Sequence, residues 1–358
     1  MSKTNKIKVS KKRTSVEAEA IVKFGLDVHA DQITARRQID GLLAQPAQKL
    51  SWKGTLECMS KHLKAGQQVY SCYEAGPCGY GLHRQLEQLG VINYVIAPQK
   101  WDHSGRQVKT DERDATQMST RLDQYIRGNK EAFTVVMVPT PEQEQRRALC
   151  RHRDRLVRER QRCVVRGCGL MLAQGIQAPR DWWQPKHWAE LSPQLPLWLR
   201  EQLEQWQGDA LRLDQRVDDL TPRVESLSTG QLLIKGYGKL TAAVVDAEIL
   251  DWHRFKNRRQ VGSFTGLCPS EHSTGKSRRQ GSINKHGNPR VRHQLVEATW
   301  RLLYWQPNYK PLHKIRAAQG ARARKRAVVA AARHLAVDLW RINTGQCTPQ
   351  SLGLVVAE

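Results

Sequence analysis

Four carboxylates in this sequence occur where they could hold a divalent cation. Asp27 ends an apolar run, FGLDVHA, and Glu74 ends a second β-rich run, VYSCYEA, so strands would deliver both side chains to the rim of a sheet. Asp111 and Asp114 are three residues apart on a predicted helix and project from one face. Carboxylates this close repel, and a bound Mg²⁺ or Mn²⁺ offsets the repulsion while leaving positions open for phosphate. The four residues predict a metal-dependent site that cuts phosphodiesters.

The segments around these carboxylates predict an α/β domain. Residues 20–40 read as a strand, a turn at 27–31 and a second strand, and further short strands are expected at 69–75 and 91–97. The stretch GLHRQLEQLG between the last two is typical of a helix. A final strand is expected at 134–138, because Pro139 and Pro141 then interrupt the pattern.

A second stretch that could do chemistry is GLCPSEHSTGKSRRQGSINKHGNPRVRHQL, residues 266–295. Hydroxyls flanked by cations and glycines, here Ser273 and Thr274, can bind phosphate passively or attack phosphorus, and composition alone favours the passive role. His272 is a candidate base. No G-x-S-x-G motif accompanies them, so a Ser-His-Asp hydrolase is not predicted. The candidate nucleic-acid-binding residues of this stretch are Lys276, Arg278, Arg279, Lys285, Arg290 and Arg292.

Between these two stretches the pattern is helical. A long helix is expected from 142 to about 170, and a second helix has apolar residues at alternating three- and four-residue steps. The heptad positions of the first helix are Leu149, Leu156, Cys163 and Leu170, and the seam of the second is Leu203, Trp206, Ala210, Leu213, Val217, Leu220, Val224 and Leu227. The two helices could form a coiled-coil arm between protomers or an ordinary α-hairpin within the chain.

The C-terminal region, from about residue 231, is expected to be mostly α-helical. LLIKGYGKLTAAVVDAEI reads as a helix-hairpin-helix-like segment in which Gly236 and Gly238 separate two helices, the second beginning near Lys239. Its glycines would let backbone N–H groups approach a DNA phosphate, although a simple tight connection explains them equally well. The last helix packs an Ala/Val/Leu face on the domain. Its basic start offers Arg322, Arg324, Lys325 and Arg326 to a nucleic-acid backbone.

The composition indicates a polyanionic partner. Lys and Arg number 58 against 34 Asp and Glu, a formal net charge of +24 over 358 residues, and a chain of this length suggests two or three domains. No apolar span of about 18 residues is present, so no membrane partner is expected. The basic N-terminus lacks the apolar core of a secretory signal, and the eight cysteines form no C-x-x-C pair, which favours reduced thiols in a cytoplasm.

Taken in order, GLDVHA, YEAGPCGYGL, KTDERDA, IKGYGKLTAAVVDAEI and GLCPSEHSTGKSRRQGSINKHGN resemble the DEDD transposases of insertion sequences known as bridge-RNA-guided recombinases. Each motif alone is weak, but the ordered set is specific and covers nearly the whole chain. The basic composition of residues 1–18 predicts a disordered arm. The resemblance implies a RuvC-like (RNase H-like) catalytic domain at 19–140, a coiled-coil arm at 141–230 and a serine transposase domain at 231–358.

The resemblance also implies roles for residues and partners. Asp27, Glu74, Asp111 and Asp114 would form the DEDD metal site, and Ser273 would be the nucleophile, with Thr274 the alternative hydroxyl. The serine would attack a DNA phosphodiester, form a phosphoserine link and release a 3′-hydroxyl that later rejoins. Donor and target DNA, a structured guide (bridge) RNA and further copies of the chain, dimers pairing into a tetramer, would be the partners. The protein would act at the nucleoid of a prokaryotic cytoplasm.

Two other functions remain open on the residues alone. A metal-dependent nuclease of the Holliday-junction type would use the same carboxylates with activated water and form no covalent link to DNA. A non-catalytic nucleic-acid-binding scaffold would need only the basic surface.

Overall fold

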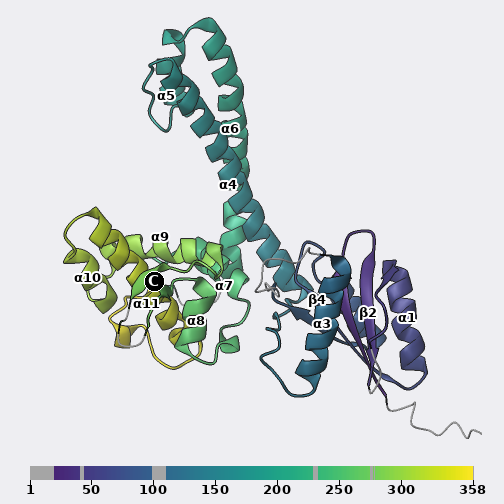
Figure 1. Ribbon diagram of the computed structural model, residues 1–358. Helices are drawn as coiled ribbons and strands as arrows, with labels where there is room; N and C mark the ends of the chain where they lie inside the picture. Colours follow the sequence, from purple (N-terminus) through teal and green to yellow (C-terminus); the bar gives the residue numbers. More distant parts are fainter. Residues whose placement is uncertain are drawn as a thin grey trace, which may run out of the picture. The chain divides into compact units, whose positions relative to one another are not determined.

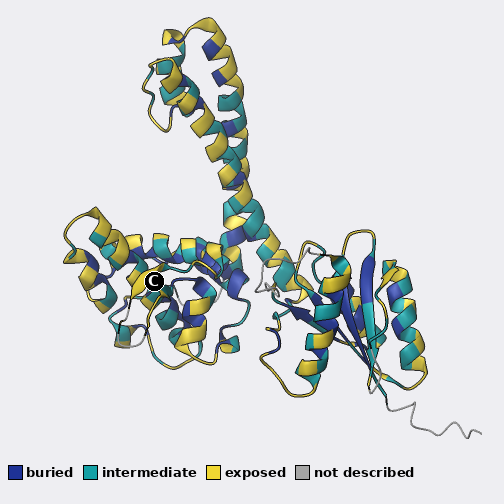
Figure 2. Cartoon of the chain, in the orientation of Figure 1, coloured by how far each residue is buried: buried dark blue, intermediate teal, exposed yellow. Residues whose placement is uncertain are grey.

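The computed structural model describes residues 20–40, 44–98, 110–228, 233–274, 277 and 279–357. Contacts within the chain divide it into two units, Met1–Val138 and Pro139–Glu358. Figure 1 shows the elements of both units, and each unit has its own buried residues, drawn dark blue in Figure 2. The basic arm expected at 1–18 lies outside the described residues.

The first unit is built on a five-stranded sheet of order β3-β2-β1-β4-β5 (Figure 1). β1 (Ile21–Val28), β2 (Ile33–Ile39) and β3 (Gln48–Leu50) are successive antiparallel neighbours. β4 (Gln68–Glu74) and β5 (Ile92–Ile96) run parallel to β1. The strands predicted in 20–40, at 69–75 and at 91–97 are confirmed.

Helices cover the two faces of this sheet. α1 (Trp52–Lys64) and α2 (Gly81–Leu89) share one core with the β1 residues Val22, Phe24 and Leu26. α3 (Asp111–Ile126) packs on the opposite face, where its Met118 and Leu122 meet Cys72 of β4. Because side chains alternate along a strand, residues 23, 25 and 27 of β1 belong to the α3 face.

Two residues of β1 hold α3 against the sheet. A Cβ on Gly25 would lie 2.3 Å from both Ala115 O and Ser119 N, so only glycine permits this close approach of helix and strand. Lys23, 1% exposed, forms ion pairs with Asp40 after β2 and with Asp123 of α3. A buried charge requires such partners, and here they join three elements.

The final strand predicted at 134–138 does not form. Val135 makes only an isolated bridge to Ile96, supported by hydrogen bonds from Ala97 N to Thr134 O (2.9 Å) and from Val136 N to Val95 O (2.8 Å). The pairing beside β5 is therefore limited to one bridge.

The second unit begins with a helical hairpin. α4 (Pro141–Ala173) and α6 (Leu197–Glu225) pack against each other within the chain, with α5 (Pro185–Leu191) between them in sequence (Figure 1). Thr140 starts α4 with a capping box to Gln143. Although α4 has 33 residues, no helix of the described residues is long and apolar enough to cross a membrane.

The buried stripe of the hairpin follows the sequence prediction only in part. In α6 every seventh residue of the predicted seam is buried, namely Leu203, Ala210, Val217 and Val224, while the intervening positions are half-buried. In α4 only Leu156 of the predicted heptad is buried, and the other buried residues are Cys150, Gly167 and Met171. Near the C-terminal end of α4 the Trp182 ring lies over Gly167, where a Cβ would come within 2.1 Å of it, while Cys150 packs with Val224 and Ala243.

The rest of the second unit is a bundle of helices around one core. Its helices are α7 (Lys239–Ile249), α8 (Arg258–Thr265), α9 (Pro289–Trp305), α10 (His313–Arg316) and α11 (Ala321–Asn343). A short antiparallel hairpin, β6 (Pro269–Glu271) and β7 (Gln280–Ile283), follows α8. The predicted long helix near 142–170, the helix from Lys239 and the last helix are therefore confirmed.

The helix-hairpin-helix-like segment is not formed in the described residues. Residues 233–238 make a bridged turn in which Ile234 pairs with both Tyr237 and Val356, in place of a first helix. Gly236 has φ +88°, which favours glycine, and Trp305 packs against it. The prediction was wrong because this segment pairs with Val356, near the C-terminus and distant in sequence. That pairing replaces the hydrogen bonds that a helix would form within the segment.

A buried carboxylate joins the hairpin to the bundle. Glu248 of α7, 3% exposed, accepts two hydrogen bonds from Arg151 of α4 (2.7 and 2.8 Å) and one from Asn288, the N-cap of α9 (2.9 Å). Burial alone would raise the pKa of Glu248, but the hydrogen bonds from Arg151 and Asn288 and the charges of Arg151 and Arg290 outweigh it, so the pKa is lowered.

Candidate functional site

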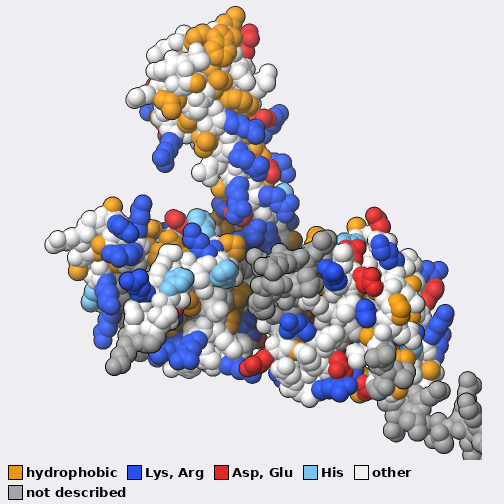
Figure 3. Space-filling view, in the orientation of Figure 1, with side chains coloured by type: hydrophobic (Ala, Val, Ile, Leu, Met, Phe, Trp, Pro, Cys, Tyr) orange, Lys and Arg blue, Asp and Glu red, His pale blue; other side chains and the backbone are white. Residues whose placement is uncertain are grey.

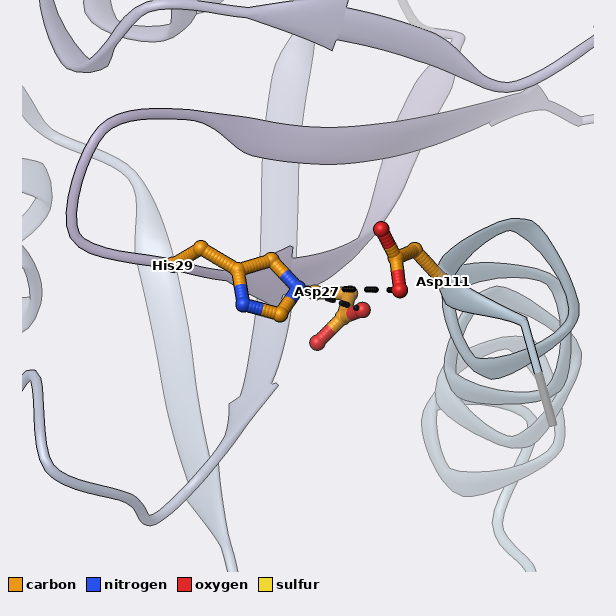
Figure 4. Close-up of side chains that lie close together, drawn as sticks. All are labelled: Asp27, His29 and Asp111. Carbon is orange, nitrogen blue, oxygen red and sulfur yellow. Dashed lines mark hydrogen bonds and ion pairs between the residues drawn. The ribbon is translucent and has the colours of Figure 1, made fainter.

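Asp27, His29 and Asp111 lie together at one corner of the sheet (Figure 4). Their ligand atoms are all within 4.8 Å of one another. His29 Nε2 is 3.2 Å from Asp27 Oδ2 and 3.7 Å from Asp111 Oδ1. Two carboxylates that are 84 positions apart in the sequence thus face one imidazole.

The local structure explains why these side chains meet. Asp27 is the penultimate residue of β1 and belongs to the face covered by α3. Thr110 caps α3 by accepting a hydrogen bond from Arg113 N, which begins the helix at Asp111. The first turn of α3 contains Asp111, Glu112 and Asp114, and the positive end of the helix dipole stabilises carboxylates there.

Asp114 and Glu74 belong to the same corner. Burial raises the pKa of Asp27; His29 opposes that shift, and the charges of Asp111 and Asp114 raise the pKa further. Glu74 ends β4, and since Leu26 pairs with Tyr73 in the parallel ladder, one more step places Glu74 beside Asp27. Alternation assigns Glu74 to the α3 face together with Cys72. The four carboxylates predicted from sequence therefore lie on one side of the sheet, although only Asp27 and Asp111 are in the tight group with His29.

The donor set fits a hard divalent cation. Carboxylate oxygens are the ligands that Mg²⁺ prefers, and an imidazole nitrogen beside them is also compatible with Mn²⁺. His29 was not among the residues predicted from sequence. The sequence feature that could have indicated His29 is its position two residues after Asp27, in the turn at the end of β1. A single histidine in a turn, however, does not reveal that its partner lies on α3.

Ser273 lies in the segment that connects β6 to β7, two residues after β6 ends, and is exposed. The strands continue past their formal ends, because His272 N donates to Arg279 O (2.9 Å) and Thr274 and Ser277 exchange backbone hydrogen bonds of 3.1 and 3.0 Å. Ser273 Oγ donates to Glu271 Oε1 at 2.8 Å. The sequence analysis did not predict Glu271 as the partner of Ser273. Residues two apart on an extended strand point to the same side, whereas adjacent residues, such as His272 and Ser273, point to opposite sides, so the alternation was the signal.

The predicted basic residues fall into three groups. Lys276 and Arg278 lie outside the described residues. Arg290 pairs with Asp154 at 3.5 Å, and Arg292 donates to the carbonyl of Thr265 at 3.0 Å, so both have structural roles. Arg279 and Lys285 are exposed, as are the four cations in the first turns of α11, Arg322, Arg324, Lys325 and Arg326. Figure 3 shows Lys and Arg side chains spread over the visible faces of both units.

Comparisons with known proteins agree on one family. The profile of the Transposase IS116/IS110/IS902 family matches residues 232–314. The transposase candidate y4rJ of Sinorhizobium fredii is 32% identical over 304 residues, 76% of each chain. The transposase for insertion sequence element IS1111A of Coxiella burnetii is 28% identical over 77% of this chain and 79% of its own length. A further Sinorhizobium fredii transposase candidate, y4pF/y4sB, is 26% identical over 93% of this chain and 86% of its own.

Proposed function

Because this chain belongs to the IS116/IS110/IS902 family of transposases, we propose that it moves an insertion sequence by cutting and rejoining DNA through a phosphoserine intermediate. The observation that carries the proposal is the acidic corner, where Asp27 and Asp111 converge with His29 and where Asp114 and Glu74 lie on the same face. A chain with a net charge of +24 that gathers carboxylates at one point is suited to a cation-assisted reaction on a polyanion.

The RuvC-like (RNase H-like) assignment of the first unit is part of this proposal. Three antiparallel strands followed by two parallel ones, in the order β3-β2-β1-β4-β5, support it. The first carboxylate lies on the central strand β1, and α3 delivers the last two across the same face. Such a sheet presents its catalytic residues where β1 and β4 end side by side.

Asp27, Glu74, Asp111 and Asp114 would hold Mg²⁺ or Mn²⁺. When bound, the cation would neutralise charge on the phosphate that is cut. The protein contributes the placement of its ligands. α3 is held to β1 by the close contact at Gly25 and by the Lys23–Asp123 ion pair, so the carboxylates of helix and strand keep their separation.

Ser273 is the proposed nucleophile and Glu271 its proton acceptor. As Ser273 Oγ bonds to phosphorus, its proton passes to Glu271 Oε1, to which it is already hydrogen-bonded at 2.8 Å. The bond from phosphorus to the 3′ oxygen breaks, and that oxygen leaves as a 3′-hydroxyl after taking up a proton. The DNA bond energy is kept in the phosphoserine link, so rejoining to another strand requires no nucleotide cofactor.

The proposed partners are donor and target DNA and a structured guide RNA, at the nucleoid of a prokaryotic cytoplasm. Exposed cations such as Arg279 and Arg322 suit backbone contacts that leave sequence recognition to base pairing. The protein would assemble as dimers that pair into a tetramer, with the α4–α6 hairpin as a coiled-coil arm. Exposed apolar residues on that hairpin support an interface: Val165 (59%), Leu172 (64%), Leu197 (61%) and Trp198 (50%).

The test is the protein–DNA adduct seen on a denaturing gel after incubation with element-end DNA and Mg²⁺. Ser273→Ala should abolish both the adduct and transposition, while Thr274→Ala should retain them because Thr274 is held in the hairpin through its backbone. The reverse pattern, an adduct in Ser273→Ala that is lost in Thr274→Ala, would transfer the nucleophile to Thr274.

The nuclease alternative is favoured by one observation, the placement of all four carboxylates within the first unit. The variant lacking both hydroxyls, Ser273→Ala with Thr274→Ala, would then still cut DNA with Mg²⁺ and leave no adduct. A scaffold without catalysis predicts that Asp27→Asn leaves transposition unchanged, whereas both catalytic functions predict its loss.

A further inference from the structure

The outer face of α9 presents aromatic rings to solvent. Tyr304 is 81% exposed, Trp305 51% and Trp300 37%. Trp300 and Tyr304 are four residues apart, so they share one face of the helix. The Trp305 ring meets the Tyr304 ring edge-on, with 4.9 Å between centroids and 85° between planes. Large exposed rings that are grouped, in contrast to single ones, indicate a binding surface.

The core does not require the Trp300 and Tyr304 rings, whereas Trp305 packs against Gly236. The buried residues of α9 are Val291, Leu295, Ala298, Thr299 and Leu302, which form its inner stripe against the bundle. At 100° per residue, positions 300 and 304 point to the side opposite this stripe. Trp300 and Tyr304 therefore add little to folding and remain available to a partner.

The surroundings of the rings are basic. Arg324 of α11 lies over the Trp300 ring, with 5.5 Å from its Cζ to the ring centroid. Arg322, Lys325 and Arg326 continue the exposed start of α11, and none of the four cations has an ion pair within the described residues. Glu297, one turn before Trp300, is an exposed acidic residue on the same face.

We propose that Trp300 and Tyr304 form a stacking platform for unpaired bases of a DNA strand, whose phosphates contact the basic start of α11. Aromatic side chains beside a cationic surface bind single strands because every base offers a π-face while the cations follow the backbone. DNA is the occupant that a transposase provides, since a strand that moves from one duplex to another is unpaired between leaving the first and joining the second. The inference rests on the proposed function only in taking DNA as the substrate.

The test is fluorescence anisotropy of a labelled oligodeoxynucleotide with the full-length protein. Trp300→Ala and Tyr304→Ala should each weaken binding of a single strand by about tenfold, with little change for the same sequence as a duplex. Trp300→Phe should retain most of the affinity, and Glu297→Gln should increase it. An otherwise identical strand with abasic sites should bind wild type and Trp300→Ala alike, because it has no bases to stack.

Trp198→Ala is the matched control, since Trp198 is also an exposed tryptophan, 50% exposed, but lies on α6. If Trp300→Ala and Tyr304→Ala lose equal affinity for the single strand, the duplex and the abasic strand, the proposed stacking platform is wrong. It is also wrong if these variants lose affinity only for an RNA strand. An altered particle mass in light scattering with unchanged DNA binding would assign the rings to a protein contact. Adduct formation by Asp27→Asn tests the catalytic proposal separately, because anisotropy requires no cutting.

Discussion

At the level of single residues, the reactivity of Ser273 depends on the carboxylate that accepts its hydroxyl hydrogen. Glu271→Gln keeps an oxygen at that position but cannot take up the proton. We expect single-turnover adduct formation to slow by about 10²- to 10⁴-fold at neutral pH, with DNA affinity unchanged. His272→Ala should retain the rate, because strand alternation directs His272 away from Ser273. If adduct formation is slow in His272→Ala and proceeds at the wild-type rate in Glu271→Gln, the histidine is the base.

Glu248 makes a prediction about stability and pH. Its folded pKa is lowered below 4.5, so its ionised form stabilises the fold above that pH, and this stabilisation is lost as the pH falls through the lowered pKa. Glu248→Gln should reduce the free energy of unfolding by about 2 kcal/mol at neutral pH, and the difference from wild type should shrink in acid. Denaturant unfolding over a pH series measures both.

The control for Glu248 is the same substitution at an exposed pair. Glu57 is 61% exposed and lies 3.9 Å from Lys53, one turn away on α1. Glu57→Gln should change stability by less than about 0.5 kcal/mol, because solvent screens such pairs. Equal effects at both positions would show that the Arg151 and Asn288 contacts are unimportant.

At the level of elements, the contact between α3 and β1 determines whether the acidic corner exists. In Gly25→Ala the new Cβ would meet backbone atoms at 2.3 Å, so α3 must move away from the strand. We expect a loss of about 1–3 kcal/mol in stability and a weaker response to Mg²⁺ in DNA cutting, because Asp111 and Asp114 move with α3. Thermal unfolding and Mg²⁺ titration of adduct formation provide the two measurements.

Gly81→Ala serves as the comparison in the same unit. Gly81 begins α2, and no atom lies within 4 Å of a Cβ built there. This variant should be at least as stable as wild type, because alanine favours a helix more than glycine does, and should show an unchanged Mg²⁺ response. If Gly25→Ala behaves like Gly81→Ala, then α3 does not depend on the close approach and the corner has another support.

At the level of the whole molecule, the excess of cations should make DNA affinity strongly dependent on salt. Each phosphate that a cation neutralises steepens the fall of log K with log salt by about 0.9 for duplex DNA. Replacing Arg322, Lys325 and Arg326 with glutamine should make the slope of log K against log salt shallower by about one for each phosphate left without its cation. The replacement should weaken binding to all DNA sequences by a similar factor. Arg212→Gln, at an exposed cation already paired with Asp209, should leave the slope unchanged.

Sequence alone was sufficient for features that depend on near neighbours. Alternation and helical periodicity predicted the strands β1, β2, β4 and β5 and the helices α2, α4 and α11 at close to their observed bounds. Asp27 and Glu74 were placed correctly at strand ends, since a strand end is visible in the local pattern. The predictions at 134–138 and before Gly236 were wrong. They rested on periodicity alone, and in both places the backbone pairs with a segment that is distant in the sequence.

The tertiary structure alone decided which side chains meet. His29 reaches Asp111 because α3 lies on Gly25, and no local pattern encodes an approach between segments so far apart in the sequence. The Trp182 ring packs over Gly167 of α4, and the outward rings on α9 form a surface only once the inner stripe is packed. Periodicity reports which face of an element is apolar, whereas the partner of that face is set by how all elements fill one core.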